Sequence, residues 1–191
     1  MFPVGPSALG DVPPLVDGDV LIRRPTAEDA DTVLAGSHDP LVREFMQGVF
    51  PHTDREAAVR WIEDVVPRLW DQDRAAYFAV TVGDGPSVGW AELVDFRPDE
   101  GVAEAAIWLL PGARRMRVAA AALRLVCRFG FEQLGLRRID AYAAADNMPV
   151  QVVGAYIGFR RAGFRPDLFR SSRTHTLHDA VYATLVPEDL C

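Results

Sequence analysis

Three arginines, Arg114, Arg115 and Arg117, stand at the start of the most regular helix that the sequence predicts. The backbone N–H groups at a helix N-terminus carry partial positive charge, so cations placed there are unfavourable unless an anion is bound. N–H groups and guanidinium groups together are well suited to bind phosphate. The pattern therefore favours an anionic ligand at this helix, and the alternative is a solvated cluster of charges.

Acidic residues form a second group that could bind a ligand. Glu92, Asp95, Asp99 and Glu100 run from a predicted strand into the turn that follows it. Most such groups are simply solvated, but acidic side chains beside a cleft attract cations. We therefore keep this group as a candidate site for a cationic substrate.

The cysteines and histidines argue against a metal site or a disulfide scaffold. Cys127 falls in an apolar helical face and Cys191 is the last residue, so neither has a cysteine partner at metal-binding spacing. His175 and His178 lie outside any predicted helix and have no nearby cysteine or glutamate partner. We expect no metal in this protein, and the cysteine usage suits a reducing, cytoplasmic environment.

Composition excludes several classes of function. The chain has 191 residues, of which 49% are hydrophobic and 25% charged, typical of a globular domain. The net charge of −7 makes binding to nucleic acid or to an anionic membrane unfavourable, so we expect neither partner. All 20 basic residues are arginine, which rules out a Schiff-base or P-loop lysine. No apolar run reaches the roughly 18 residues of a membrane span, and the first residues do not form a signal peptide.

The order of predicted elements indicates a mixed α/β domain. Residues 1–18 are rich in proline and glycine and are predicted to be an N-terminal tail, followed by a single domain over residues 19–191. Apolar periodicity and turn signals place the elements beyond the tail. In chain order we expect a strand at 20–24, helices at 26–36 and 53–71, strands at 76–82, 88–94 and 103–110, a helix around 118–129, a strand at 138–143, a helix at 149–157, and strands from 158 and at 179–185. The three central strands read as an antiparallel meander, so the sheet should be mixed and mostly antiparallel, with helices on its faces.

Residues 21–30, 103–111 and 158–161, with Asn147 between the last two, resemble the GNAT acyltransferase superfamily, in particular the branch that acetylates ribosomal-protein N-termini. Residues 21–30 (LIRRPTAEDA) resemble the opening strand and helix start of the family, and residues 103–111 (AEAAIWLLP) resemble its fourth strand. The similarity continues through Asn147 and residues 158–161 (GFRR) to about residue 185. The resemblance implies an α/β GNAT fold in which the fourth and fifth strands splay apart and acetyl-CoA, or another acyl-CoA, inserts between them.

The resemblance also implies residues for the cofactor. Leu109 and Leu110 would pair with the pantetheine through their backbone, and Asn147 would line the cofactor side. The pyrophosphate loop of the family has the pattern Q/R-x-x-G-x-G/A, and the matching segment contains Arg114, Arg115, Arg117, Val118, Ala119 and Ala120. Arg117 replaces a glycine of this pattern. Either the backbone approach to the phosphates is lost, or the arginines replace it with charge-assisted hydrogen bonds.

On the catalytic side, Glu104 matches the family glutamate that is often assigned as the general base. Trp90, Glu92 and Asp95 would lie at the acceptor cleft. The Ser and Tyr positions of the family, which can protonate the leaving thiolate, are occupied by Val150 and Gly154. An alternative register places Ala155 and Phe159 there instead, so no general acid is identified in either case.

The implied function is an N-acyltransferase that acts on a small-molecule amine or a protein N-terminus, and a homodimer is one expected assembly. The alternative is a GNAT-like protein without acyltransferase activity, serving as a binding or scaffolding module or running repurposed chemistry.

Overall fold

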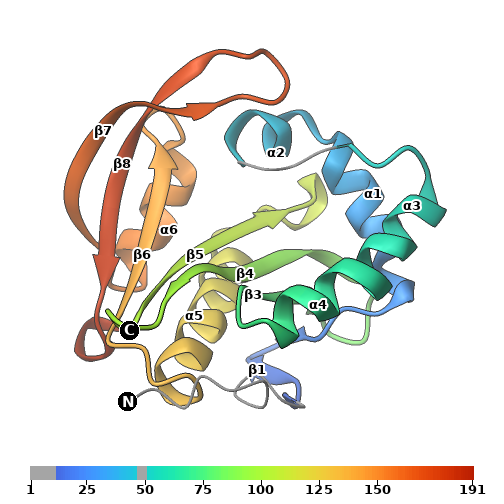
Figure 1. The fold of residues 1–191 in the computed structure, drawn as a ribbon, viewed down its shortest axis with the longest axis horizontal. Coiled ribbons are helices and arrows are strands. Elements are labelled where there is room, and N and C mark those ends of the chain that lie inside the picture. Colours follow the sequence, from blue (N-terminus) through green and yellow to red (C-terminus); the bar gives the residue numbers. More distant parts are fainter. Residues whose placement is uncertain (1–11, 47–50) are drawn as a thin grey trace.

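The computed structural model describes residues 12–46 and 51–191 and shows one eight-stranded sheet with helices on both faces (Figure 1). The strand order is β1-β2-β3-β4-β5-β6-β8-β7. The elements are β1 (Leu15–Asp17), β2 (Val20–Arg23), α1 (Ala30–His38), α2 (Pro40–Phe45), α3 (Arg55–Arg60), α4 (Val66–Asp71), β3 (Ala75–Val82), β4 (Ser87–Arg97), β5 (Val102–Leu109), α5 (Met116–Glu132), β6 (Arg138–Ala144), α6 (Met148–Tyr156), β7 (Arg160–Arg170) and β8 (Leu177–Leu185).

The predicted fold class is confirmed. Each neighbouring pair of strands is antiparallel except β5 and β6, which run parallel. The meander expected from three consecutive central strands is formed by β3, β4 and β5. A parallel pair needs a crossover connection, and α5 supplies it between β5 and β6.

The strands β5 and β6 separate after a short paired stretch. Their parallel register covers residues 102–104 of β5, ending where Glu104 lies opposite Asp140, and no further register pair joins them among the described residues. β5 nevertheless continues along β4 as far as Leu109, and β6 continues along β8 as far as Ala144. These two strands are the fourth and fifth of the sequence prediction, so the expected splay is present.

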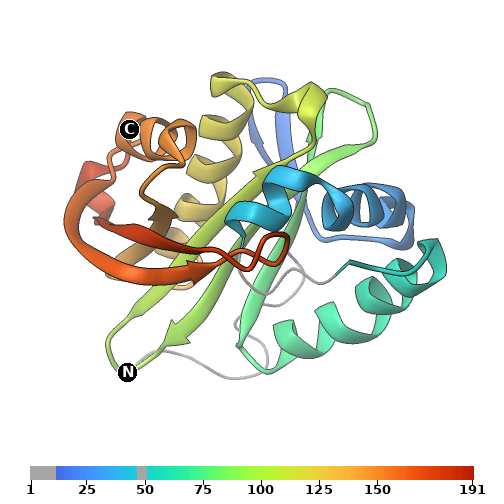
Figure 2. The same cartoon turned by 90° about the horizontal axis from the view of Figure 1, so that it is seen from above.

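The long helix α5 covers one face of the sheet (Figure 2). Its predicted stripe, which includes Val118, Leu125 and Phe129, is buried. Phe129 packs edge-on against Phe78 of β3, with ring centroids 5.1 Å apart. Burial of this apolar stripe stabilises α5 far more than helix propensity does, because an isolated helix of this length is marginal in water.

The helices α1, α3 and α4 cover the opposite face, and a wide helical turn (Trp61–Val65) joins α3 to α4. Here Trp90 of β4 stacks on Trp108 of β5, with centroids 6.3 Å apart and ring planes within 7°. Gly36 lets α1 approach closely, since a Cβ atom at that position would lie 2.3 Å from the ring of Trp108.

Three expectations about the elements need correction. Leu15–Asp17 forms β1 and pairs with β2, so it is not part of a tail, while the predicted tail residues 1–11 lie outside the described residues. The helix α2 was not predicted, although Asp39 caps its N-terminus and Pro40 occupies its first turn. The strand β7 begins at Arg160 and runs to Arg170, beyond the short strand expected after Gly158. None of the helices in the described part of the chain is both long and apolar enough to cross a membrane.

Candidate active site

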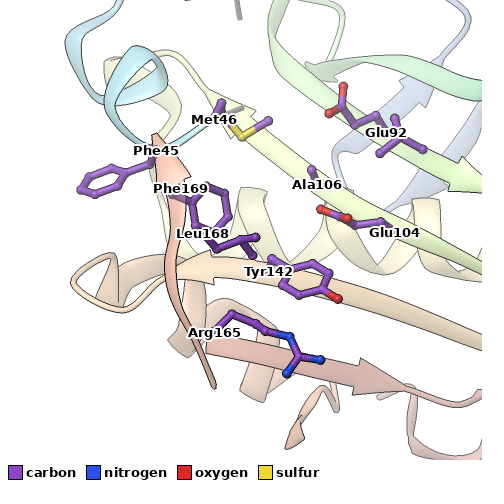
Figure 3. Close-up of a pocket in the computed structure, with 10 residues that line it drawn as sticks. Phe45, Met46, Glu92, Glu104, Ala106, Tyr142, Arg165, Leu168 and Phe169 are labelled. Atoms are coloured by element: carbon purple, nitrogen blue, oxygen red, sulfur yellow. The ribbon is translucent and has the colours of Figure 1, made fainter. Parts of the chain in front are cut away.

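A pocket of about 280 Å³ opens beside the splayed strands (Figure 3). It is bounded by the sheet on one side and by α2 and the β7–β8 hairpin on the other. Its lining residues are Phe45, Met46, Glu92, Val94, Glu104, Ala106, Tyr142, Arg165, Leu168 and Phe169. Sequence analysis anticipated two of them, Glu92 and Glu104, as site residues.

The register of β4 and β5 places Glu92 and Glu104 on the same face of the sheet. Glu92 lies opposite Ala106, and Val94 lies opposite Glu104. Side chains alternate between faces along a strand, so the two glutamates are diagonal neighbours on one face. Only the methyl group of Ala106 stands directly across from Glu92, which leaves room for both carboxyl groups in the pocket.

Both glutamates hold their protons more tightly than exposed carboxyl groups do. Burial, reinforced by the negative charges of Asp95 and Asp140 and opposed by Arg97, raises the pKa of Glu104 to about 7. Burial and the charge of Glu104 raise the pKa of Glu92 to about 7 as well. A carboxyl group with a pKa near neutrality is well matched to accept a proton at physiological pH.

Among the described residues, the nearby arginines form no ion pair with either glutamate, because they bind Asp140. The Asp140 carboxylate, 1% exposed, accepts hydrogen bonds from Arg97 Nη2 and Arg138 Nε, each at 2.7 Å. Burial by itself would raise the pKa of Asp140, but hydrogen bonds from Arg138, Arg97 and Tyr182 outweigh this effect and lower the pKa. Asp140 thus anchors two cations behind the pocket and contributes negative charge to the surroundings of Glu104.

Two of the residues expected at the acceptor cleft do not line the pocket. Asp95 sits at an irregularity in the β4–β5 pairing with a φ of 49°, and its side chain is 65% exposed and 3.4 Å from Arg97. Trp90 is 2% exposed and belongs to the core beneath α1 and α3. Of the three predicted acceptor residues, only Glu92 faces the pocket, and Asp95 acts on Glu104 through its charge.

The outer wall of the pocket depends on a buried glutamate in α2. Glu44 is 8% exposed and accepts hydrogen bonds from Ser171 Oγ (3.0 Å), Arg173 Nε (2.9 Å) and Thr174 Oγ1 (3.1 Å), and its Oε1 lies 2.9 Å from His178 Nε2. Burial would raise the pKa of Glu44, but these hydrogen bonds, led by His178, lower it to about 2. Glu44 therefore stays ionised and ties α2 to the β7–β8 hairpin.

The hydrogen bonds of Glu44 hold apolar side chains of α2 and of the β7–β8 hairpin at the pocket, and the sequence did not identify these side chains as site residues. Phe45 and Met46 follow Glu44 directly, and Leu168 and Phe169 come from the hairpin just before Ser171. Their elements are far apart in the chain, so no spacing in the sequence links them. The available signal was the Asp39–Pro40 helix start, which predicts α2 but not what it packs against.

The N-terminus of α5 retains the properties expected of an anion site. Arg115 is its N-cap residue and, among the described residues, no side chain caps the helix. The first intrahelical hydrogen bond joins the N–H of Ala119 to the carbonyl of Arg115, so the N–H groups before it lack an intrahelical acceptor. Val118 and Ala120 are each only 2% exposed, so their side chains pack in the core and do not reach a ligand at this end of the helix.

The three arginines at this end of α5 differ in their surroundings. Arg114 donates from Nε to the carbonyl of Leu109 at 2.9 Å and forms an ion pair with Asp39. Arg117 forms an ion pair with Asp19 at the surface. Arg115 is exposed and has no ion-pair partner among the residues the structure describes. Its guanidinium is thus the one of the three that is available to an incoming phosphate.

The remaining predicted cofactor residues lie near the edges of β5 and β6, where these two strands separate. Leu110 donates its N–H to the carbonyl of Val88 at 2.8 Å and accepts from the N–H of Ala113 at 2.9 Å, while Leu109 pairs with Gly89. Asn147 is the N-cap residue of α6 at the end of β6, and its side chain makes no capping hydrogen bond. An open strand edge next to an uncapped helix N-terminus fits a ligand that has both amide and phosphate groups.

Comparisons with known proteins agree with this geometry. The sequence matches the acetyltransferase (GNAT) domain family over residues 19–160. No curated protein sequence gives a significant match. Among solved structures, RimJ from Mycobacterium smegmatis in complex with CoA-disulfide superposes with a TM-score of 0.74 at 23% identity, covering 94% of this chain and 88% of that one.

Two further structures share the fold at lower identity. The ribosomal-protein-S5-alanine acetyltransferase from Vibrio fischeri has a TM-score of 0.76 at 15% identity, covering 94% of this chain and 100% of that one. The microcin C7 self-immunity acetyltransferase MccE, in complex with acetyl-CoA and AMP, has a TM-score of 0.77 at 13% identity, covering 89% and 93%. The family match spans well over half of the sequence, and the splayed sheet agrees with it. The chain belongs to the GNAT acetyltransferase family.

Proposed function

We propose that this protein transfers the acetyl group of acetyl-CoA to the nitrogen of a primary amine. The observation that carries the proposal is the pair of partly buried glutamates, Glu92 and Glu104, in a pocket beside the splayed strands. An amine must lose a proton to become a nucleophile, and a carboxylate with a pKa of about 7 accepts it at neutral pH. Family membership supports the same reaction.

In this proposal Glu104 is the general base. Acetyl-CoA supplies an acetyl group activated as a thioester. Glu104 takes a proton from the substrate ammonium group, and the freed amine attacks the thioester carbonyl to form the new C–N bond. The C–S bond breaks, the CoA thiolate leaves with the electron pair, and the second proton that the nitrogen must lose passes through water to that thiolate. Neither Val150 nor Gly154 can donate a proton to that thiolate, so the protein relies on proximity, orientation and proton removal.

For the cofactor we propose the gap between β5 and β6, with the pyrophosphate at the N-terminus of α5. The backbone N–H groups there and the guanidinium of Arg115 would bind the phosphates, and Leu109, Leu110 and Asn147 would border the pantetheine. We place Arg114 in a supporting role, because its hydrogen bond to Leu109 and its ion pair with Asp39 connect the loop to α2.

The test is ligand binding followed by turnover. Acetyl-CoA at 100 times its Kd should stabilise the protein by about 2.7 kcal/mol in a thermal-shift experiment. Release of free CoA thiol should then depend on an added primary amine. An absence of both stabilisation and competition with any CoA ester at millimolar concentration would contradict cofactor binding, and binding without amine-dependent thiol release would favour a non-catalytic module.

Replacing Arg115 with alanine should weaken acetyl-CoA binding about tenfold or more, since a hydrogen bond to a charged group contributes about 1.5–3 kcal/mol. Arg117→Ala is the matched control, because that guanidinium already pairs with Asp19 and should matter less. Calorimetric titration of both variants measures the difference. Equal losses in the two variants would show that the arginines act only through net charge.

A further inference from the structure

The pocket is polar at its two ends and apolar along one wall. Figure 3 shows the carboxyl groups of Glu92 and Glu104 on one side of Tyr142 and the guanidinium of Arg165 on the other. Arg165 comes from β7, where it lies opposite Ala180 of β8. No acidic side chain in the described part of the chain forms an ion pair with Arg165. Each pole of the pocket therefore presents charge that the protein itself does not neutralise.

The acidic pole lacks a cation of its own. Arg97 and Arg138 direct their guanidinium groups to Asp140, and no ion pair reaches Glu92 or Glu104 among the described residues. Two neighbouring carboxyl groups in a partly dehydrated site repel each other when ionised, and both hold their protons up to a pH of about 7. An ammonium group placed between them would relieve this repulsion and supply the missing hydrogen-bond donors.

The apolar wall of the pocket lies beside both charged ends, the one with Glu92 and Glu104 and the one with Arg165. Phe45 and Met46 at the end of α2, together with Leu168 and Phe169 from β7, form it (Figure 3). The pairing of β7 with β8 is irregular between Arg165 and Phe169, and this irregularity brings Leu168 and Arg165 to the same pocket. Glu44 holds the two parts of the wall together through its hydrogen bonds to the hairpin. A cavity of about 280 Å³ suits one small molecule better than a long chain.

We propose that the acceptor is a free α-amino acid with an apolar side chain, bound with its ammonium group at Glu92 and Glu104, its carboxylate at Arg165, and its side chain against Phe45, Met46, Leu168 and Phe169. This inference rests on the proposed acetyltransferase activity and names its substrate class. A guanidinium binds a carboxylate through two parallel hydrogen bonds, which fixes orientation as well as charge. The product would be the N-acetyl amino acid.

The same arrangement discriminates against other amines. A polyamine would bring a second positive charge towards Arg165, where like charges repel. A lysine side chain of a protein would place an aliphatic chain there and offer Arg165 no carboxylate. A peptide N-terminus would present a neutral amide carbonyl in place of the carboxylate and would extend beyond the pocket. Amino acid amides have the same ammonium group and side chain without the negative charge, so they isolate the contribution of Arg165.

The experiment measures kcat/KM by thiol release at saturating acetyl-CoA for L-leucine, L-methionine and L-phenylalanine and for their amides. Putrescine and a tripeptide amide that begins with leucine are also measured as acceptors. We expect the wild-type protein to prefer each acid over its amide by about 10- to 100-fold in kcat/KM, because the amide lacks the carboxylate that forms a pair of charge-assisted hydrogen bonds with Arg165. In Arg165→Met the ratio of acid to amide should fall towards one. Arg161→Met changes an exposed arginine on the same strand outside the pocket and should keep the wild-type ratio.

The outcomes separate this inference from the proposed activity. Equal or better turnover of the amides, of putrescine or of the tripeptide would overturn the amino acid assignment while leaving the acetyltransferase intact. An acid-to-amide ratio that persists in Arg165→Met would likewise overturn it. If no amine promotes thiol release, the proposed activity fails as well. Thermal unfolding of both arginine variants verifies that each remains folded, so that a changed ratio reports on recognition.

Discussion

Replacement of Glu104 by glutamine should lower kcat for acetyl transfer by about 10²- to 10⁴-fold, the usual contribution of a general base. The carboxamide keeps the shape of the side chain but cannot accept a proton at neutral pH. Acetyl-CoA binding should change little, because the proposed cofactor contacts come from the N-terminus of α5 and from Leu109, Leu110 and Asn147 rather than from Glu104. Steady-state kinetics with a calorimetric Kd for acetyl-CoA separates these two effects.

The pH dependence should carry the signature of the same residue. Glu104 acts in its ionised form, so the wild-type rate should rise as the pH passes upward through about 7, its pKa in the folded protein. Asp95 and Asp140 raise this value, Arg97 lowers it, and Glu104 in turn raises the pKa of Glu92, so the charges of all these residues belong in any fit. In Glu104→Gln this inflection should disappear, and the deficit should shrink at high pH, where more of the amine is already neutral.

The control for this variant is Asp99→Asn, which removes an exposed carboxylate outside the pocket and should leave kcat unchanged. Full activity of Glu104→Gln across the pH range would place the base elsewhere, with Glu92 as the next residue to test, or would show that water suffices.

The largest expected effect on stability comes from Asp140→Ala. Removing this buried carboxylate would take from Arg97 and Arg138 their shortest ion pairs and leave only the longer contacts of both with the exposed Glu100 and of Arg97 with Asp95. Breaking a buried ion pair from one side typically costs about 3–5 kcal/mol. The two guanidinium groups are 32% and 37% exposed, so solvent screens part of the loss and we expect about 3 kcal/mol. For a domain of this size that lowers Tm by roughly 6–12 °C.

Thermal unfolding followed by circular dichroism measures this loss, with the exposed Asp99→Ala as the control. The pKa of Asp140 is lowered by folding, so its stabilising contribution is present above its unfolded pKa of about 3.9 and is lost as the pH falls through its lower value in the folded protein. The difference in unfolding free energy between wild type and Asp140→Ala should therefore decrease below about pH 4. If this difference in unfolding free energy were unchanged at about pH 2 to 3, an electrostatic role for Asp140 would be contradicted.

Local patterns in the sequence predicted most of the elements because those patterns act over short distances. The apolar stripe of Val118, Leu125 and Phe129 predicts α5, and burial of this stripe confirms it. Alternation and turn signals predict the meander of β3, β4 and β5, which pairs residues that are close in the chain. The meander also carries Glu92 and Glu104, so one face of the candidate site follows from neighbouring strands alone.

The sequence left open how the charged residues pair, because ion pairs depend on packing between distant segments. Three arginines at the start of α5 look equivalent in the sequence. In the fold, Arg114 pairs with Asp39 and Arg117 pairs with Asp19, whereas Arg115 has no ion-pair partner within residues 12–46 and 51–191. Asp95 and Glu92 similarly look alike as acidic neighbours, but the irregular pairing of β4 turns Asp95 outward.

Only the tertiary structure decided the other half of the pocket. Arg165 reaches it because β8 inserts between β6 and β7 and because the β7–β8 pairing is irregular next to Arg165, neither of which a local pattern encodes. Phe45 and Met46 reach it because Glu44 binds side chains more than 120 residues away in the chain. The sequence by itself thus determined most of the elements, the family resemblance and the two glutamates. The folded chain decided which charges remain unpaired and which apolar side chains surround the acceptor, since both depend on contacts between segments that are distant in sequence.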